Sequence, residues 1–295
     1  MKKANKSNKN LKMILQISLN EYRSWLKNPK LMILIFAFLY VWNEICRLFA
    51  DKAELMGGRK LQILEPFIGM MNSTLTQMIL PLLFIVLISD YPRITPDTLM
   101  IIQRTGRKNW LFGHMLFAVE AAVTFMVSMF IVVSIPFVFK AGFSNEWSEV
   151  TTRFVIEHPN MANTAYATIL PSNVYLHGGP VVSALFCFLM GVVTYFFYSM
   201  ILTLFALKGK KIPGLITVTA LILVGCAVSL KRSLFTWVLP AGHSLYYLHY
   251  RAALRKPYLQ PWISVVYFVI IITATCIMEV IMVRKVSIIG NKNGE

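Results

Sequence analysis

Six long apolar stretches constrain the fold of this chain more than any other feature of its sequence. Each meets or approaches the roughly 20 apolar residues that a helix needs to cross about 30 Å of hydrocarbon. Because lipid cannot satisfy backbone polar groups, and because the runs lack the alternation of barrel strands, we expect six membrane-spanning helices and an all-α fold. The stretches cover approximately residues 31–48, 67–89, 110–138, 181–207, 212–230 and 262–283.

The composition supports this class. Hydrophobic residues make up 57% of the chain and charged residues 14%, whereas an ordinary soluble domain has about 25% charged residues. The net charge of +16 could suggest nucleic acid. However, the basic residues are dispersed among the apolar stretches instead of gathered on one soluble face, so we expect anionic lipid headgroups and no nucleic acid as the partner.

The distribution of Lys and Arg sets the expected orientation. With both termini in the cytoplasm, most of the 29 basic residues lie on the inner side, as the positive-inside rule requires. Segment 231–261, which contains Lys231 and Arg232, is the exception because it is basic and lies outside. The sequence then divides into a basic tail and helix over 1–30, a six-helix domain over 31–284 and a cytoplasmic tail over 285–295. The inner loop is 91–109, and the other outer loops are 49–66 and 140–180, the latter a candidate cap or a plain connection.

The N-terminal segment predicts an amphipathic helix that ends at Asn28-Pro29. Its lysine-rich composition suits a bacterial plasma membrane. An in-plane helix bent into the first span would form an elbow, because proline disfavours helix at the residue before it. The alternative is a basic tail with no such role. The apolar face consists of Leu11, Leu15, Leu19, Tyr22 and Leu26.

Loop 91–109 predicts a second short helix. Thr95 can act as its N-cap, Pro96 suits the first helical position, and Asp97 is favoured in the first turn. Gly106 can end the helix. The apolar residues inside this helix need a partner protein, or they dip into the lipid headgroups.

From Thr98 to His114 the sequence reads TLMIIQRTGRKNWLFGH. This segment, with the elbow and the six spans, resembles the membrane subunit of type 2 ATP-binding cassette (ABC) transporters. That family often has Thr-Leu-Glu, a short apolar run, paired basic residues and Gly-Lys. Here Met100 stands where Glu is common and His114 where Lys is common. The resemblance covers most of the chain in architecture but about 20 residues in motif.

The resemblance implies a permease in the plasma membrane that works as a dimer with itself or a related permease, and with two ABC ATPase subunits. The chain lacks a GxxxxGK[ST] P-loop, so we expect no enzyme activity of its own and no bound cofactor, with ATP and Mg held by the partner. Amphipathic or antimicrobial peptides and lipid-linked molecules are the expected exported substrates. The implied coupling residues are Thr98, Leu99, Met100, Ile101, Ile102, Arg104, Arg107 and Lys108. The alternatives are a membrane scaffold or sensor without transport and, third, a membrane-integral enzyme.

Ionisable residues within apolar stretches are functional candidates. Glu120 lies about ten residues into the third stretch, roughly 15 Å deep if that span starts near Trp110. It could line a pathway or bond to a neighbouring helix. Glu279 is expected to snorkel or to pair with Arg284. The spacing of His243 and His249 predicts no metal site, and the aromatic residues around them predict an interfacial belt or a short re-entrant helix.

Overall fold

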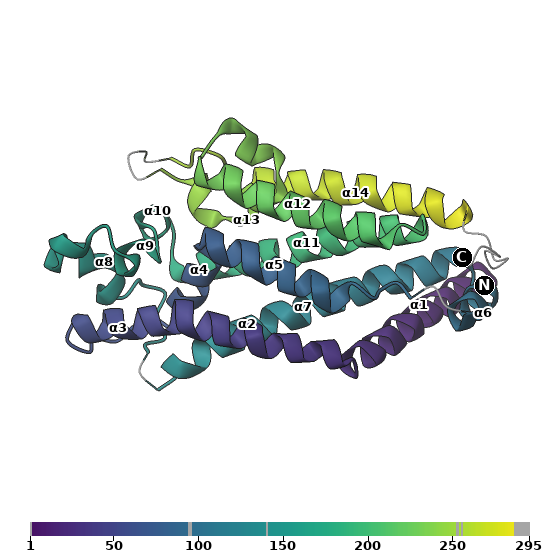
Figure 1. The fold of residues 1–295 in the computed structure, drawn as a ribbon, viewed down its shortest axis with the longest axis horizontal. Coiled ribbons are helices and arrows are strands. Elements are labelled where there is room, and N and C mark those ends of the chain that lie inside the picture. The colour runs from purple at the N-terminus through teal and green to yellow at the C-terminus, as the bar shows by residue number, and fades with distance from the viewer. Residues whose placement is uncertain (1, 94–95, 140, 252–253, 255, 286–295) are drawn as a thin grey trace.

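The computed structural model describes residues 2–93, 96–139, 141–251, 254 and 256–285. Every named element in these ranges is helical, which confirms the all-α expectation. The helices form an elongated bundle. α1 (Lys2–Leu26), α6 (Pro96–Thr105) and the last turn of α14 (Pro261–Lys285) lie at one end, which we call the α6 end (Figure 1). α3 (Arg47–Leu55), α8 (Glu149–Glu157), α9 (Ala165–Thr168) and α10 (Ser172–Tyr175) lie at the other, the α8 end.

Five continuous helical segments are long and apolar enough to cross a bilayer, which supports a multi-pass membrane protein. The first is Pro29–Leu55, in which η1 (Pro29–Met32), α2 (Ile33–Val41), the π-helical turn η2 (Trp42–Cys46) and α3 follow one another without a break. The second is Arg107–Phe137, formed by α7 (Arg107–Ser134) and η3 (Ile135–Phe137). The other three are α11 (Pro180–Leu207), α12 (Lys211–Leu230) and Pro261–Arg284 of α14. The first segment therefore extends beyond residue 48 into the expected loop 49–66.

The stretch 67–89 does not form one straight helix, contrary to expectation. It divides into α4 (Glu65–Asn72) and α5 (Thr74–Ile88), which meet at an angle of 84°. Ser73 between them is extended, and its hydroxyl caps α5 by accepting a hydrogen bond from the Thr76 amide. The Asn72 side chain accepts a hydrogen bond from the Tyr247 amide. These polar contacts make the bend favourable. With 15 residues, α5 is about 22 Å long, shorter than the hydrocarbon core.

α1 packs along the first half of α7 (Figure 1). Gly113 on α7 permits the close approach, because a Cβ atom there would lie 2.7 Å from Ile17 Cγ2. Tyr22 and Thr124 share a hydrogen bond between their hydroxyls, and the Trp25 indole donates to the Leu87 carbonyl. α1 ends before Asn28-Pro29 as predicted, and the Asn28 side chain accepts from the Lys30 amide.

A buried carboxylate organises the α8 end. Glu65 at the start of α4 is completely buried and accepts hydrogen bonds from the Ser148 amide and from the Ser148 and Thr151 hydroxyls. The Lys52 ammonium is also buried and lies 5.0 Å from the centre of the Phe154 ring. Residues 148–154 therefore fold onto α3 and α4, and the cap over a translocation path stays a prediction.

The described residues of the basic segment 231–261 lie towards the α8 end. α13 (Pro240–Ser244) and η6 (Tyr246–His249) fold back into the bundle and contact α11. Tyr246, Tyr247 and Tyr250 are buried while Trp262 is exposed. The re-entrant alternative therefore describes the centre of this segment better than an interfacial belt.

Candidate functional site

The apolar residues of α6 divide between two faces. Ile102 is 3% exposed and belongs to a cluster with Ile17 and Trp110, against which Leu99 is partly buried. In contrast, Met100 is 60% exposed and Ile101 43% exposed. The sequence pattern predicts the whole run as a partner surface, whereas the structure leaves only the Met100–Ile101 side free for an intermolecular contact.

The basic end of α6 continues this exposed face. Arg104 and Lys108 are exposed, whereas Arg107 is half-buried and its guanidinium donates a hydrogen bond to the Arg284 carbonyl of α14. Gly106 separates α6 from α7 with a φ of 86°, in the left-handed region that favours glycine. The Thr98 hydroxyl donates to the Arg93 carbonyl at 2.7 Å and so supports the first turn of α6. The predicted N-cap Thr95 lies outside the described residues.

A pocket of about 330 Å³ lies between α1 and α6. Gln16, Asn20 and Glu21 of α1 line one side, and Thr98 and Ile101 of α6 line the other. The Glu21 carboxylate lies 2.7 Å from His114 Nδ1, and His114 Nε2 lies 3.1 Å from the Thr203 hydroxyl of α11. The pocket wall is thus connected by hydrogen bonds to α7 and α11.

Glu120 lies between α7 and α1. Its carboxylate accepts a hydrogen bond of 2.7 Å from Ser18, which is completely buried. Phe117, about one turn earlier, packs against Tyr91, which directly follows the charged residue Asp90. Glu120 lies within the apolar helical segment Arg107–Phe137, in agreement with its expected place in the third apolar stretch. The pathway role stays a prediction.

Glu279 does not pair as expected. It is completely buried, and neither carboxylate oxygen has a hydrogen-bond partner among the described residues. Arg284, near the end of the same helix, is exposed, and its backbone carbonyl accepts the hydrogen bond from Arg107. Snorkelling and pairing with Arg284 are therefore both wrong for this arrangement of α14.

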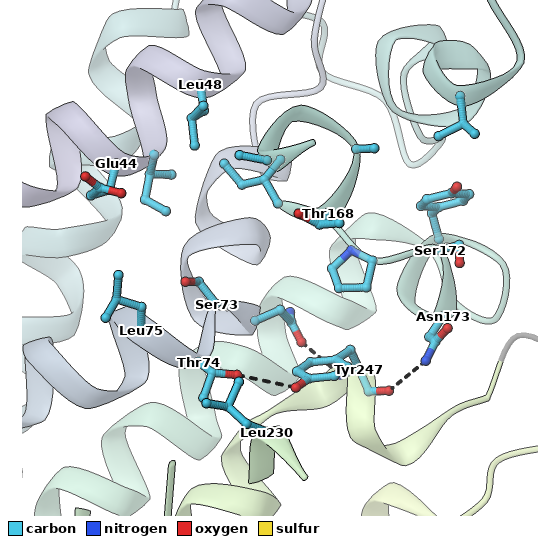
Figure 2. A pocket seen from close by; sticks show the side chains of 18 of the residues that line it. Glu44, Leu48, Ser73, Thr74, Leu75, Thr168, Ser172, Asn173, Leu230 and Tyr247 are labelled. Atoms are coloured by element: carbon cyan, nitrogen blue, oxygen red, sulfur yellow. Dashed lines mark hydrogen bonds between the residues drawn. The ribbon is translucent and has the colours of Figure 1, made fainter. Parts of the chain in front are cut away.

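A cavity with a volume of about 750 Å³ lies at the α8 end (Figure 2). We call it the α5 cavity, because Ser73 and Thr74 at the start of α5 lie at its centre. A bundle cavity of this size with mixed polarity is typical of small-molecule sites. Its lining comprises Tyr40, Glu44, Ile45, Leu48, Asn72, Ser73, Thr74, Leu75, Val155, Ala162, Ala165, Ala167, Thr168, Ile169, Pro171, Ser172, Asn173, Tyr175, Leu230, Arg232 and Tyr247.

Two charged residues line the α5 cavity. Glu44 belongs to the π-helical turn η2, and its carboxylate accepts a hydrogen bond of 3.1 Å from the side-chain amide of the neighbouring Asn43. Such turns are frequent at functional sites. Arg232 has a φ of 49°, which is rare for a residue with a side chain, and its guanidinium carbon lies 5.7 Å from the centre of the Tyr247 ring. The cavity therefore has one acidic and one cationic side chain, which come from different segments of the chain.

The α5 cavity is not predicted from the sequence. The signal that could have indicated it is Asn72-Ser73-Thr74, three polar residues inside an apolar stretch. Polar groups at membrane depth are stable where they cap a helix or line a cavity. In this chain, Ser73 caps α5 and all three residues line the cavity.

Comparison with protein-family models, with curated proteins and with solved structures finds no match to this chain.

Proposed function

We propose that this chain is the permease subunit of an ABC transporter that exports an amphipathic substrate, using ATP hydrolysed by separate subunits. The observation that carries the proposal is the exposed Met100–Ile101 face of α6, followed by the exposed cations Arg104 and Lys108. An exposed apolar pair beside a basic helix end suits the groove of a partner protein, because contact with a partner removes the apolar surface from water.

The inner contacts of α6 support a role in coupling. Ile102 packs against Trp110 at the start of α7 and Ile17 of α1, and Val283 of α14 belongs to the same cluster. A partner that moves the exposed face of α6 would therefore displace three helices of the bundle. In the proposed complex, the ABC ATPase binds this face, holds ATP and Mg, and lies in the cytoplasm with both termini.

Aromatic side chains fill the space between α5, α7 and α11 in a single bundle. Phe84, Phe125 and Tyr195 are nearly completely buried, and the Phe84 and Tyr195 rings stack with their centres 5.0 Å apart. The substrate path in our proposal therefore runs along the interface with a second copy or a related permease. α1 runs beside α7 from the Asn10–Asn109 contact to the Tyr22–Thr124 contact, so it follows the bundle and does not lie across it as an in-plane elbow would. We place this end of the bundle at the cytoplasmic side of the bacterial plasma membrane.

A membrane sensor or scaffold without transport is the second candidate. The α5 cavity favours it, because a ligand site at the α8 end could report to a partner at the α6 end without passage of the ligand. The two candidates differ in whether an ATPase partner binds α6 and whether its ATP hydrolysis moves substrate.

Co-purification with an ABC ATPase encoded beside this gene tests the proposal. We expect the double variant Met100→Asp, Ile101→Asp to lose the ATPase while its melting temperature stays within a few degrees of the parent. The matched control is Phe143→Asp with Ile156→Asp, which changes two residues that are 78% and 77% exposed at the α8 end. Retention of the ATPase by the α6 variant would contradict the proposal, and vesicle transport by the pair separates a permease from a sensor.

A further inference from the structure

We propose that the α5 cavity binds the headgroup of a zwitterionic phospholipid that enters from the surrounding leaflet. The inference names a ligand class for the α8 end. As an assignment of transported substrate it rests on the proposed permease function, whereas binding itself requires neither ATP nor a partner subunit.

The first argument is the side on which the cavity borders the bilayer. Leu75 of α5 and Leu230 of α12 line the cavity and are 49% and 68% exposed. α5 and α12 pack against each other, and both helices expose apolar residues along the spanning region. An acyl chain can therefore lie on the α5–α12 surface while the attached polar group occupies the cavity, which a purely aqueous ligand would not require.

The second argument is charge. Glu44 and Arg232 have no ion-pair partner of opposite charge among the described residues. They line the cavity from the first spanning segment and from the residues after α12, respectively. One acidic and one basic group match a ligand with an ammonium and a phosphate. A ligand of a single charge would leave one of them uncompensated.

The third argument is the arrangement of neutral hydrogen-bonding groups. Figure 2 shows Ser73, Thr168 and Ser172 among the side chains that line the cavity. A phosphate and its ester oxygens accept hydrogen bonds and would use the hydroxyls of Ser73 and Ser172, whereas the Thr168 hydroxyl already donates to the Thr164 carbonyl at 3.1 Å. The bend between α4 and α5 places Ser73 here, so the local break in the apolar stretch supplies the headgroup site.

The arrangement of charges favours a phospholipid over a cationic peptide. A peptide rich in Lys or Arg would place several positive charges beside Arg232, and Glu44 is the only acidic residue in the described lining. Positive charges gathered in one cavity repel each other. A phosphoethanolamine or phosphocholine group has one charge of each sign and avoids this conflict.

Native mass spectrometry of the purified full chain in detergent tests the inference. The probes are dioleoyl-phosphatidylcholine, dioleoyl-phosphatidylethanolamine and dioleoyl-phosphatidylglycerol, and the measurement is the apparent Kd of the first bound lipid. We expect the two zwitterionic lipids to bind about five- to tenfold more tightly than the anionic one. This is the ratio expected for one charge-assisted contact.

Three variants locate the binding. Glu44→Gln and Arg232→Gln should each weaken phosphatidylcholine binding about fivefold, because each removes one charge partner. Ala165→Trp should block binding by filling the cavity, since Ala165 lines it and is exposed. The matched controls are Glu54→Gln and Lys231→Gln, which neutralise exposed charges at the same end outside the cavity lining. Only variants whose melting temperature equals that of the parent are compared.

Equal affinity for the three lipids, or equal effects of the cavity variants and their controls, would overturn the inference. So would displacement of phosphatidylcholine by a cationic amphipathic peptide that binds more tightly and depends on Glu44, which would assign the cavity to peptides. Selective lipid binding without ATPase association would leave the inference standing and refute the permease function. The two conclusions therefore fail separately.

Discussion

The Lys30 ammonium donates a 2.6 Å hydrogen bond to one carboxylate oxygen of Asp90, so that the start of the first span is attached to the end of α5. The other carboxylate oxygen accepts from the Asn28 side chain at 3.2 Å, and the Lys211 ammonium donates to the Asp90 carbonyl. Three segments far apart in the sequence therefore meet at one acidic residue at the α6 end.

This junction predicts a loss of stability at acidic pH. Burial raises the pKa of Asp90, but the hydrogen bonds from Lys30 and Asn28 and the positive charges of Lys30 and Arg93 outweigh burial and hold the pKa below its ordinary 3.8. A carboxyl with a depressed pKa stabilises the folded state above its unfolded pKa. That contribution is lost as the pH falls through the lower folded value.

We expect Asp90→Asn to lower the free energy of unfolding by about 1 kcal/mol or less at pH 7, because the side chain is 35% exposed and solvent screens the pair. The difference between parent and variant should shrink as the pH falls from 5 to 3. Thermal unfolding in detergent at each pH measures it. A constant difference across this range would show that the charge of Asp90 is not the cause.

The two faces of α6 predict opposite effects of truncation. Ile102→Ala should lower the free energy of unfolding by about 2–3 kcal/mol, because it leaves a cavity among buried residues. Ile101→Ala, one position away and 43% exposed, should change it by about 0.5 kcal/mol or less. Chemical unfolding of the two variants checks this, and similar losses at both positions would contradict the orientation of α6.

The contact between Ser18 and Glu120 predicts which substitution the α1–α7 packing tolerates. Glu120→Gln retains an oxygen that can accept from Ser18, so we expect nearly unchanged stability. Glu120→Ala leaves the buried Ser18 hydroxyl without its partner and should cost about 1–3 kcal/mol.

Transport by Glu120→Gln decides the pathway hypothesis. Because the carboxylate faces α1 and does not line the described cavities, we expect full activity. Loss of transport at an unchanged melting temperature would instead assign Glu120 to the pathway.

The sequence predicts the helical class, the positions of most spans and the short helix before Gly106, because each depends on local hydrophobicity or capping. It could not predict the burial of Ile102 beside the exposure of Ile101, since that depends on where α1 and α14 dock. The α5 cavity likewise depends on Asn72 meeting the Tyr247 amide, a contact between distant segments. Hydropathy treats 67–89 as continuous because it averages over the three polar residues at the bend.

The Glu65 contacts predict that segment 140–180 depends on one carboxylate. Glu65→Ala should lower the free energy of unfolding by about 3–5 kcal/mol, because it leaves the buried Lys52 ammonium without its nearby charge and Ser148 and Thr151 without their acceptor. Glu54→Ala, at an exposed position on α3, is the matched control. Thermal unfolding and trypsin cleavage at Arg153 of α8 measure the effect, and protection equal to that of the control would contradict it.

The buried histidines of the α8 end predict a second, separate dependence on pH. The neutral His243 ring donates from Nε2 to the Trp237 carbonyl at 2.8 Å and accepts at Nδ1 from the Ser264 hydroxyl at 2.7 Å. Burial lowers the pKa of His243 from 6.5 to about 4, and it also lowers the pKa of His249. A protonated ring would lose the bond from Ser264.

Between about pH 6.5 and 4 the unfolded chain binds a proton at position 243 that the folded chain does not. Stability should therefore decrease as the pH falls through this window, by at most about 3 kcal/mol for His243. His243→Gln cannot titrate and should flatten the profile of melting temperature against pH, even if the variant is less stable at pH 7. A profile as steep as that of the parent would show that other groups cause the acid sensitivity. Because this window lies above the Asp90 transition, one titration in detergent distinguishes the two ends of the bundle.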